Sequence, residues 1–227
     1  MKIISRALPL IAAGAILTGT GFSQDKQNKV GFVRLANAVA PGTGPLQMSV
    51  DGQTLNPDGY ALGDVTGGVN LKPGTHEVTI TREGTKEGKT KVNILPDETT
   101  ILIPFAEQVP ASDSEPAHWE IRVLRLKQRE PEFERSATFV SVSRNPEIRV
   151  EMRDPEGKWN PVFVKRLAVA QAPILYPRGY VPIKSGDLEL QSIPVSDIGN
   201  YVVLLYDDTD GKTKALNFRD YKFLSAD

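Results

Sequence analysis

The sequence has 227 residues, enough for one large domain or two ordinary ones, and its 40% of hydrophobic and 24% of charged residues are typical of a globular chain, not a disordered one. Its formal net charge of −1 gives no electrostatic basis for a nucleic-acid partner. Because the chain contains no cysteine, we expect no disulfide, no thiol catalysis, no cysteine-based zinc site and no lipid anchor of the cysteine type.

Residues 1–23 have the pattern of a secretory signal peptide. Two basic residues precede an apolar run over residues 7–18, and small residues follow it. We expect cleavage after Ser23, with cleavage after Gly21 as the next choice. The alternative is an uncleaved anchor, but the apolar run is shorter than the ~20 residues that span a bilayer. The sequence therefore predicts an extracytoplasmic protein, in the periplasm, at the cell surface or secreted.

The 17 prolines and 19 glycines lie between short apolar runs, which favours an all-β chain. Period-two alternation and turn residues predict seven short strands in the first half, separated by turns and by loops over 40–45 and 107–117. The predicted strands cover residues 29–38, 46–50, 60–66, 69–71, 75–81, 90–95 and 99–105. Strands at this spacing are typical of an immunoglobulin-like β-sandwich.

The stretch from Val69 to Ile80 is the clearest turn-and-strand signal in the chain. Pro73 and Gly74 have the chemistry of a type II turn, in which proline fixes φ at the second position and glycine accepts a positive φ at the third. After the turn, His76 falls in register with the apolar positions of the strand. We therefore expect His76 to be a structural residue.

Two further segments set the domain boundary. The continuous apolar run within 99–105 predicts a strand covered on both faces. Residues 118–127 predict a strand, although their three basic residues, together with Arg129, leave a helix as the alternative. The Pro-containing, highly charged stretch 128–136 predicts the boundary, so we expect one sandwich over 29–130 and a second over 136–227.

The second half resembles the first at an offset near one hundred residues, which predicts a tandem repeat. Residues 137–142, 148–152, 177–183, 188–190, 201–205 and 212–218 correspond to strands of the first half or complete the second. Asp154-Pro155-Glu156-Gly157 stands where Asp51-Gly52 forms a predicted hairpin turn. The fold prediction is thus all-β, with two tandem immunoglobulin-like β-sandwiches after a signal peptide.

The first half also resembles the DUF4397 domains of secreted bacterial proteins. The resemblance rests on residues 33–38, 46–52, 63–68 and 72–78, which include a strand ending in Asp-Gly and a Pro-Gly-Thr turn before a valine-rich strand. The second half departs from this pattern, since its turns lack the Asp-Gly and Gly-Thr pairs. The resemblance implies an extracytoplasmic sandwich, and it supplies no catalytic residues.

Few residues offer catalytic or metal chemistry. His76 and His118 are the only histidines, and neither has a partner at the spacing of a zinc site or a Gly-x-Ser-x-Gly nucleophile motif nearby. Asp207, Asp208 and Asp210 precede Gly211, but an EF-hand frame fails because its twelfth position is asparagine. We therefore predict a hairpin turn there, no metal, no cofactor and no catalytic residue.

Exposed aromatic side chains could form a platform for a sugar ring. The candidates are Trp159, Tyr176 and Tyr180, with Trp119 as a further option, although packing in the core is the more common role of such residues. Paired carboxylates for glycoside hydrolysis remain an alternative, since 28 acidic residues offer many pairs, but no spacing singles out one pair.

These features predict an exported, non-enzymatic protein with a structural, adhesive or scaffold role. A carbohydrate-binding module is the second hypothesis, and a hydrolase is the third. The expected partner is a cell-envelope protein or glycan. Strand edges also allow self-association, and residues 89–95 are the predicted edge.

Overall fold

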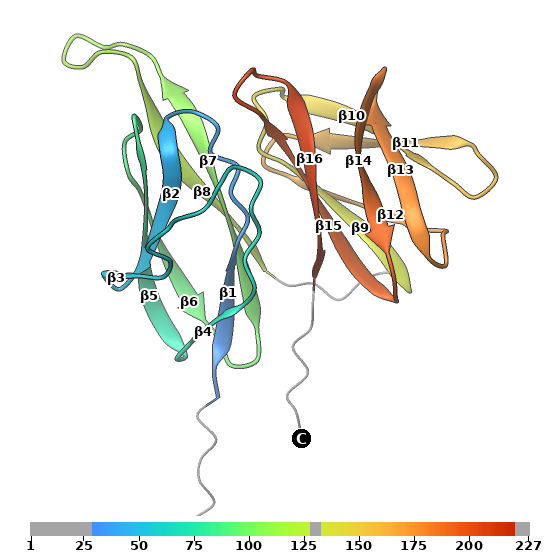
Figure 1. Cartoon of the computed structure of the whole chain (residues 1–227), viewed down its shortest axis with the longest axis horizontal. Coiled ribbons are helices and arrows are strands. Elements are labelled where there is room, and N and C mark those ends of the chain that lie inside the picture. Colours follow the sequence, from blue (N-terminus) through green and yellow to red (C-terminus); the bar gives the residue numbers. More distant parts are fainter. Residues whose placement is uncertain (1–28, 128–132, 221–227) are drawn as a thin grey trace, which may run out of the picture.

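A computed structural model describes residues 29–127 and 133–220. All regular secondary structure in these two ranges is β-strand. The sixteen strands of these ranges form four sheets of four strands, which pair into two β-sandwiches (Figure 1). The predicted all-β fold with two tandem sandwiches is thereby confirmed. Among the described residues, no helix is long and apolar enough to cross a membrane.

The first sandwich contains the strands from β1 to β8. Their bounds are β1 (Gly31–Leu35), β2 (Thr43–Val50), β3 (Gln53–Thr54), β4 (Val69–Leu71), β5 (Gly74–Glu83), β6 (Gly88–Ile94), β7 (Thr99–Val109) and β8 (His118–Lys127). One sheet has the order β4-β1-β7-β8 and the other has the order β3-β2-β5-β6. Strand β1 lies antiparallel to β4 and parallel to β7.

The second sandwich contains the strands from β9 to β16. Their bounds are β9 (Arg135–Ser141), β10 (Glu147–Arg153), β11 (Trp159–Lys165), β12 (Val169–Pro173), β13 (Gly179–Ser185), β14 (Leu188–Val195), β15 (Gly199–Asp207) and β16 (Thr213–Asp220). The sheet orders are β12-β9-β15-β16 and β11-β10-β13-β14, and β9 lies parallel to β15. Strand for strand, this is the order of the first sandwich.

Turn chemistry places several of these strands as predicted. Asp51 and Gly52 join β2 to β3 with φ values of 50° and 80°, the paired positive values that a type I′ hairpin needs. Pro73 and Gly74 join β4 to β5, where Gly74 has a φ of 137°. Residues 118–127 form strand β8, so the helical alternative for this segment is wrong.

Some predicted boundaries are wrong. Residues 60–66 form two isolated bridges instead of a strand, because Gly59 and Gly63 take positive φ values and turn the chain out of the extended conformation. Strands β2 and β7 extend into the predicted loops, beginning at Thr43 and ending at Val109. The strands β3, β11 and β12 were not predicted. The predicted signal peptide lies outside the described residues, as does most of the predicted boundary segment.

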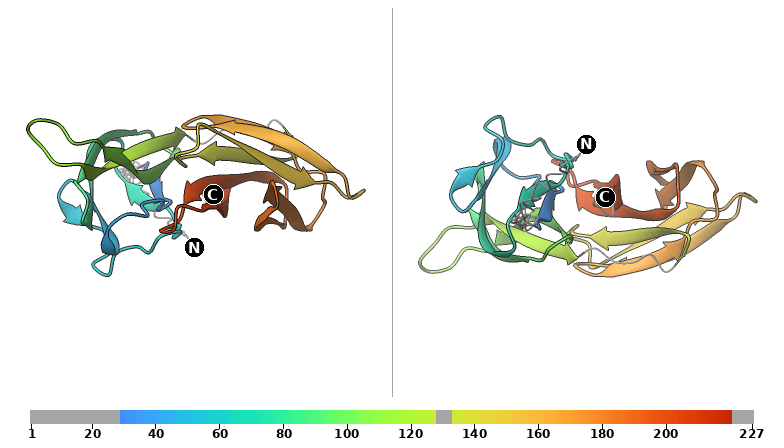
Figure 2. Two further views of the ribbon diagram at one scale, coloured as in Figure 1. Left: turned by 90° about the horizontal axis from the view of Figure 1, so that it is seen from above. Right: turned by 90° about the horizontal axis from the view of Figure 1, so that it is seen from below.

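Each sandwich has its own apolar core between its two sheets. Met48, Val78 and Leu102 are buried in the first core, and Phe139 and Val203 are buried in the second. Burial of such side chains contributes roughly 1.5–3 kcal/mol each before the entropy cost of folding. The two sandwiches lie side by side in both views of Figure 2.

Candidate functional site

The two sandwiches share a third apolar cluster, formed where the sheet β4-β1-β7-β8 packs against the sheet β12-β9-β15-β16. Its buried members are Ala36, Ala38, Ile101, Ile103, Phe105, Val140, Val142, Val202, Leu204 and Phe218. In β7, Ile101 and Ile103 face this cluster while Leu102 faces the core of the first sandwich. The predicted burial of β7 on both faces is confirmed. One face packs in the core of the first sandwich, and the second sandwich covers the other face.

Arg34 of β1 joins the first sandwich to the second at one end of this interface. Its side chain is buried, its Nη1 donates to the carbonyl oxygen of Arg219 at 2.8 Å, and its Nε donates to the carbonyl of Thr66 at 3.2 Å. The guanidinium carbon lies 5.1 Å from the ring centroid of Phe218, within the range of a cation–π contact.

Arg166 makes the reciprocal connection from the second sandwich to the first. Its Nη2 donates to Oε1 of Glu107 at 2.6 Å, and its guanidinium carbon lies 5.6 Å from the ring centroid of Phe105. Its Nε donates to the carbonyl of Ser143 at 3.0 Å, which fixes the side chain within its own sandwich. Each sandwich thus contributes one arginine that stacks on a phenylalanine of the other.

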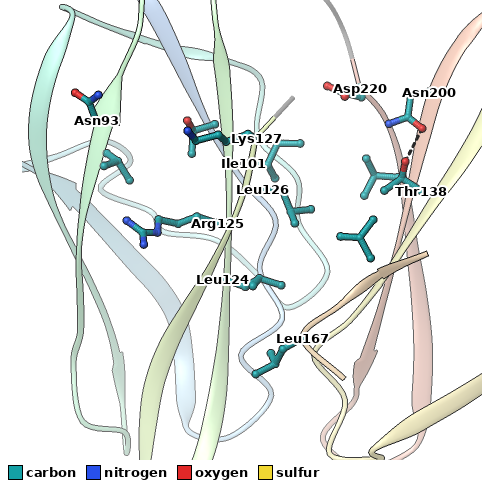
Figure 3. A pocket seen from close by; sticks show the side chains of 14 residues that line it. Asn93, Ile101, Leu124, Arg125, Leu126, Lys127, Thr138, Leu167, Asn200 and Asp220 are labelled. Carbon is teal, nitrogen blue, oxygen red and sulfur yellow. Dashed lines mark hydrogen bonds between the residues drawn. The ribbon is translucent and has the colours of Figure 1, made fainter. Parts of the chain in front are cut away.

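A groove with a cavity volume of about 620 Å³ opens between the sandwiches beside this interface. We call it the interdomain groove. In Figure 3, Ile101, Leu124 and Leu126 of the first sandwich form one wall, and Thr138 and Asn200 lie on the opposite wall. The volume falls within the range of small-molecule sites, which are typically apolar with a few polar groups and often lie between domains.

Asn200 is the polar centre of the second wall. Its side chain is only 4% exposed, and its Oδ1 accepts hydrogen bonds from the hydroxyls of Ser136 at 3.0 Å and Thr138 at 2.7 Å. Gln171 in turn donates to the Thr138 hydroxyl at 3.4 Å. These donors fix the orientation of the amide, so its Nδ2 lies on the side of the groove (Figure 3).

Leu167 closes the other end of the groove with an unusual backbone conformation. Its φ of 57° lies in the left-handed region, which is uncommon for a leucine, and its side chain is 41% exposed. The backbone N–H of Leu167 donates to the carbonyl of Ser141 at 2.7 Å, which holds this conformation.

A second hollow of about 320 Å³ lies between the sandwiches and contains two carboxylates. Asp207 accepts hydrogen bonds from the Ser143 hydroxyl at 2.6 Å and from the backbone N–H and Nε of Arg144 at 2.8 and 3.2 Å. Asp208 accepts from the backbone N–H groups of Lys212 and Asp210, and the first of these contacts is the main cause that lowers its pKa. Asp208 therefore serves the hairpin turn predicted at this place, while Asp207 holds Ser143 and Arg144 in the loop between β9 and β10.

A glycosidase needs one carboxyl group with a raised pKa to act as the general acid. Among the described residues, Asp51, Glu115, Asp154 and Asp208 have a pKa that departs clearly from the ordinary value, and each is lowered by accepted hydrogen bonds. The arrangement of these four groups favours the ionised form, which cannot donate a proton.

The three residues predicted as an aromatic platform have different surroundings in the structure. Tyr176 packs against the second core and donates its hydroxyl proton to the carbonyl of Asp154 at 3.0 Å. Trp159 is half-buried, with Lys184 Nζ 4.7 Å and the Arg153 guanidinium carbon 5.9 Å from its ring centroid. Tyr180 is 73% exposed. Only Tyr180 therefore offers a largely open ring, and half-buried Trp119 lines the second hollow.

The structure also places both histidines. His76 lies between two turns, with its Nδ1 2.7 Å from Asp51 Oδ2 and its Nε2 2.7 Å from the Lys72 carbonyl oxygen. These contacts, the one to Lys72 first, raise its pKa above 6.5. His118 begins β8, and its Nδ1 lies 3.0 Å from the carbonyl oxygen of Pro116. The two histidines lie on different strands, His76 on β5 and His118 on β8, and neither lines the interdomain groove.

Sequence reasoning did not identify the groove residues. Asn200 and Leu167 carry no motif, and their importance comes from their partners in space. The one signal in the sequence was the two-sided apolar run of β7, which indicated a second covering layer.

The chain matches no family model and no curated protein. Among solved structures, it is similar to the Bacillus anthracis TIE protein, at 12% sequence identity and a TM-score of 0.26, over 82% of this chain and 34% of that chain. The chain therefore spans about a third of that protein's length. A TM-score this low supports no statement about function.

Proposed function

We propose that the chain is an exported, non-enzymatic protein with a structural, adhesive or scaffold role in the periplasm or at the cell surface. The observation that carries this proposal is the face-to-face packing of the two sandwiches through a shared apolar cluster, locked by Arg34 and Arg166. A pair of sandwiches joined in this way holds its surfaces at a fixed separation and orientation, which is what a spacer or scaffold needs.

The chemistry of the side chains supports a non-catalytic role. The carboxylates of the second hollow are occupied by backbone and side-chain donors, and both histidines have partners in turns. A nucleophile–base–orienter arrangement would need a histidine within hydrogen-bond reach of a serine or threonine. The contacts of His76 and His118 are instead with carboxylate and carbonyl oxygens.

The two sandwiches also support an origin by duplication of one domain, the first DUF4397-like and the second divergent. Both have the same order of strands in both sheets, including the parallel pair of the first and seventh strands. Under this proposal, the extracytoplasmic localisation follows from the signal-peptide pattern of residues 1–23.

A fusion experiment tests the export and the rigidity together. An alkaline phosphatase fused after residue 227 should be active in the periplasm with the full chain and inactive when residues 2–23 are deleted. Spin labels on one exposed position of each sandwich, Glu87 and Glu156, should give a single narrow distance distribution. A cytoplasmic fusion, or a broad distribution, contradicts the proposal.

A further inference from the structure

The register of the strands aligns the two sandwiches residue by residue. Leu35 of β1 pairs with Leu102 of β7, and Phe139 of β9 pairs with Val203 of β15. Each of these four side chains is buried in the core of its own sandwich. Since both strand pairs are parallel and occupy the same place in their sheets, Leu35 is equivalent to Phe139 and Leu102 is equivalent to Val203.

The loops before β4 and β12 support this alignment. The backbone N–H of Gly63 donates to the carbonyl of Asn37 at 2.9 Å, and that of Leu167 donates to the carbonyl of Ser141 at 2.7 Å. Gly63 has a φ of 88° and Leu167 has a φ of 57°, so both residues take the left-handed conformation. The unusual backbone of Leu167 is therefore a feature of the repeated fold, which has a glycine at the equivalent place in the first sandwich.

The shared apolar cluster is symmetric under this alignment. Ile101 and Ile103 of β7 are equivalent to Val202 and Leu204 of β15, and all four are buried in the cluster. The ten buried residues of the cluster and the six partly buried ones packed against them form eight equivalent pairs. The other six pairs are Ala36 with Val140, Ala38 with Val142, Val65 with Val169, Phe105 with Tyr206, Leu124 with Leu216 and Leu126 with Phe218.

Contacts across the interface also occur in reciprocal pairs. Arg166, which directly precedes Leu167, stacks on Phe105 at 5.6 Å. Gly63, the equivalent of Leu167, lies against Tyr206, the equivalent of Phe105, because a Cβ on Gly63 would be 3.1 Å from the Tyr206 hydroxyl oxygen. Such reciprocity, in which equivalent surfaces meet each other, is the property of an isologous interface with two-fold symmetry.

One contact of this interface lacks its counterpart, and the interdomain groove lies there. Arg34 stacks on Phe218 at one end of the interface. Thr138 and Leu126 are the equivalent residues at the other end, and both line the groove. A threonine side chain is too short to cross the interface as Arg34 does. The groove is thus the place where the second sandwich lacks an arginine equivalent to Arg34.

We propose that the interface between the sandwiches is homotypic, so that the surface of each sheet fits a copy of itself. Its further partner is the same sheet, β4-β1-β7-β8, of a second copy of this chain. The tandem sandwiches reproduce within one chain a symmetric dimer of single sandwiches. This inference rests on the duplication proposed above and adds the surface and its partner. Because the two faces cover each other in the intact chain, pairing with a second copy requires the connection between the sandwiches to be cut.

A cleavable form of the full chain tests the pairing. Residues 128–132 are replaced by a flexible insertion with a protease site, and the chain is cleaved after folding. Native mass spectrometry should first show pairs of a first and a second sandwich. After incubation, it should also show pairs of two first sandwiches. A cleaved protein that gives only mixed pairs, or only single sandwiches, overturns the proposal.

Two substitutions in the cleavable chain locate the pairing surface. Ile103→Asp places a carboxylate in the shared cluster, so we expect it to abolish the pairs of two first sandwiches. Thr81→Asp is the matched control, because Thr81 is exposed on β5, in the sheet outside the interface, and its pairs should persist. Pairs that survive Ile103→Asp overturn the proposal. If like sandwiches never pair while the spin labels give one narrow distance distribution, the homotypic interface is wrong and the scaffold role stands.

Transfer of the arginine tests the equivalence in the intact chain. Arg34→Thr should lower the denaturant midpoint, and adding Thr138→Arg with Leu126→Phe should restore at least half of that fall, because it builds the same contact at the other end. Ser136→Arg in place of Thr138→Arg is the matched control: Ser136 is also buried on β9, but its equivalent is Phe32, so this variant should restore nothing. Recovery by both variants, or by neither, contradicts the two-fold equivalence and overturns the proposal.

Discussion

The guanidinium of Arg34 in β1 lies 5.1 Å from the ring centroid of Phe218 in β16, although the two residues are 184 positions apart in sequence and belong to different sandwiches. The same guanidinium donates to the carbonyl of the next residue, Arg219. Because Arg34 is buried, both contacts occur away from water, where hydrogen bonds to charged groups contribute roughly 1.5–3 kcal/mol. Arg34 is therefore a principal link between the two sandwiches.

Arg34→Met tests this link, because methionine keeps much of the apolar volume and removes every donor. We expect the free energy of unfolding to fall by about 2 kcal/mol, since the carbonyls of Thr66 and Arg219 lose a buried partner. Denaturant titration followed by tryptophan fluorescence measures the change. Arg122→Met is the control, since its surface ion pairs with Glu107 and Glu120 contribute only about 0–1 kcal/mol. Equal effects of the two variants would show that Arg34 is not a link.

The shared apolar cluster gives a second prediction. Ile103→Asp places a carboxylate in the interface, so we expect the sandwiches to separate while each remains folded around its own core. Calorimetry should then resolve two unfolding transitions in place of one. Leu102→Ala on the adjacent face of β7 should instead destabilise the first sandwich by about 2–5 kcal/mol. A single transition for Ile103→Asp contradicts the prediction.

Sequence patterns predicted the strands better than they predicted the contacts between sandwiches. Met48 and Val50 alternate with polar residues, so the burial of β2 follows directly from period two. The burial of Arg34, in contrast, does not follow from the pattern. A charged residue among apolar neighbours indicates a solvent-facing position on a half-buried strand. Arg34 is buried because the second sandwich covers that face of β1. The alternation of residues within one strand does not show whether another domain packs on its outer face.

The interdomain groove could not be predicted for the same reason. Asn200 is one polar residue at the start of an apolar strand, and only its register with Ser136 and its hydrogen bond from Thr138 reveal a hydrogen-bonded centre. The positive φ of Leu167 has no signal in the sequence, because glycine, asparagine and aspartate are the residues that usually adopt it. Both features depend on the packing of segments that are distant in sequence.

The His76 site predicts a pH dependence of stability. Both ring nitrogens lie 2.7 Å from oxygen acceptors, and only the protonated ring donates to both. Its pKa is therefore raised above 6.5, with the Lys72 carbonyl as the first cause and the Asp51 carboxylate as the second. The contribution of His76 is fully present below the unfolded-state pKa of about 6.5 and is lost as pH rises through the higher folded-state value.

We therefore expect the melting temperature to fall as the pH rises above about 6.5 through the raised pKa of His76, and His76→Gln to remove this slope. The pKa of Asp51 is lowered, with the backbone N–H of Glu77 as the first cause, so its own contribution is lost only as pH falls through that lowered value. Thermal denaturation at a series of pH values measures both the loss of stability at higher pH due to His76 and the loss at low pH due to Asp51. His118→Gln is the control for loss of a histidine elsewhere, and it should leave the slope above pH 6.5 intact.

The aromatic residues give a prediction about carbohydrate binding. The ring of Trp159 already contacts two cationic side chains, Arg153 and Lys184. We therefore expect Trp159→Ala to leave retention on glucan and mucin columns unchanged and to lower stability by about 1 kcal/mol through the loss of these contacts. Affinity electrophoresis and denaturant titration measure the two effects. Tyr180→Ala is the comparison, since this ring is 73% exposed. A loss of retention only with Trp159→Ala would restore the platform hypothesis.

Strand β6 contains the edge that the sequence indicated for association, and Arg125 of β8 covers part of it. Arg125 Nη1 donates to the carbonyl of Lys91 at 2.7 Å, which occupies an edge acceptor that another strand could use. We expect Arg125→Ala to expose this acceptor and to shift the protein from monomer toward a concentration-dependent dimer. Sedimentation velocity over a range of concentrations detects the change. Arg122→Ala on the same strand removes an arginine that forms ion pairs with Glu107 and Glu120, and this variant should remain in the parent state. Dimerisation of both variants would point to lost charge and not to the uncovered edge.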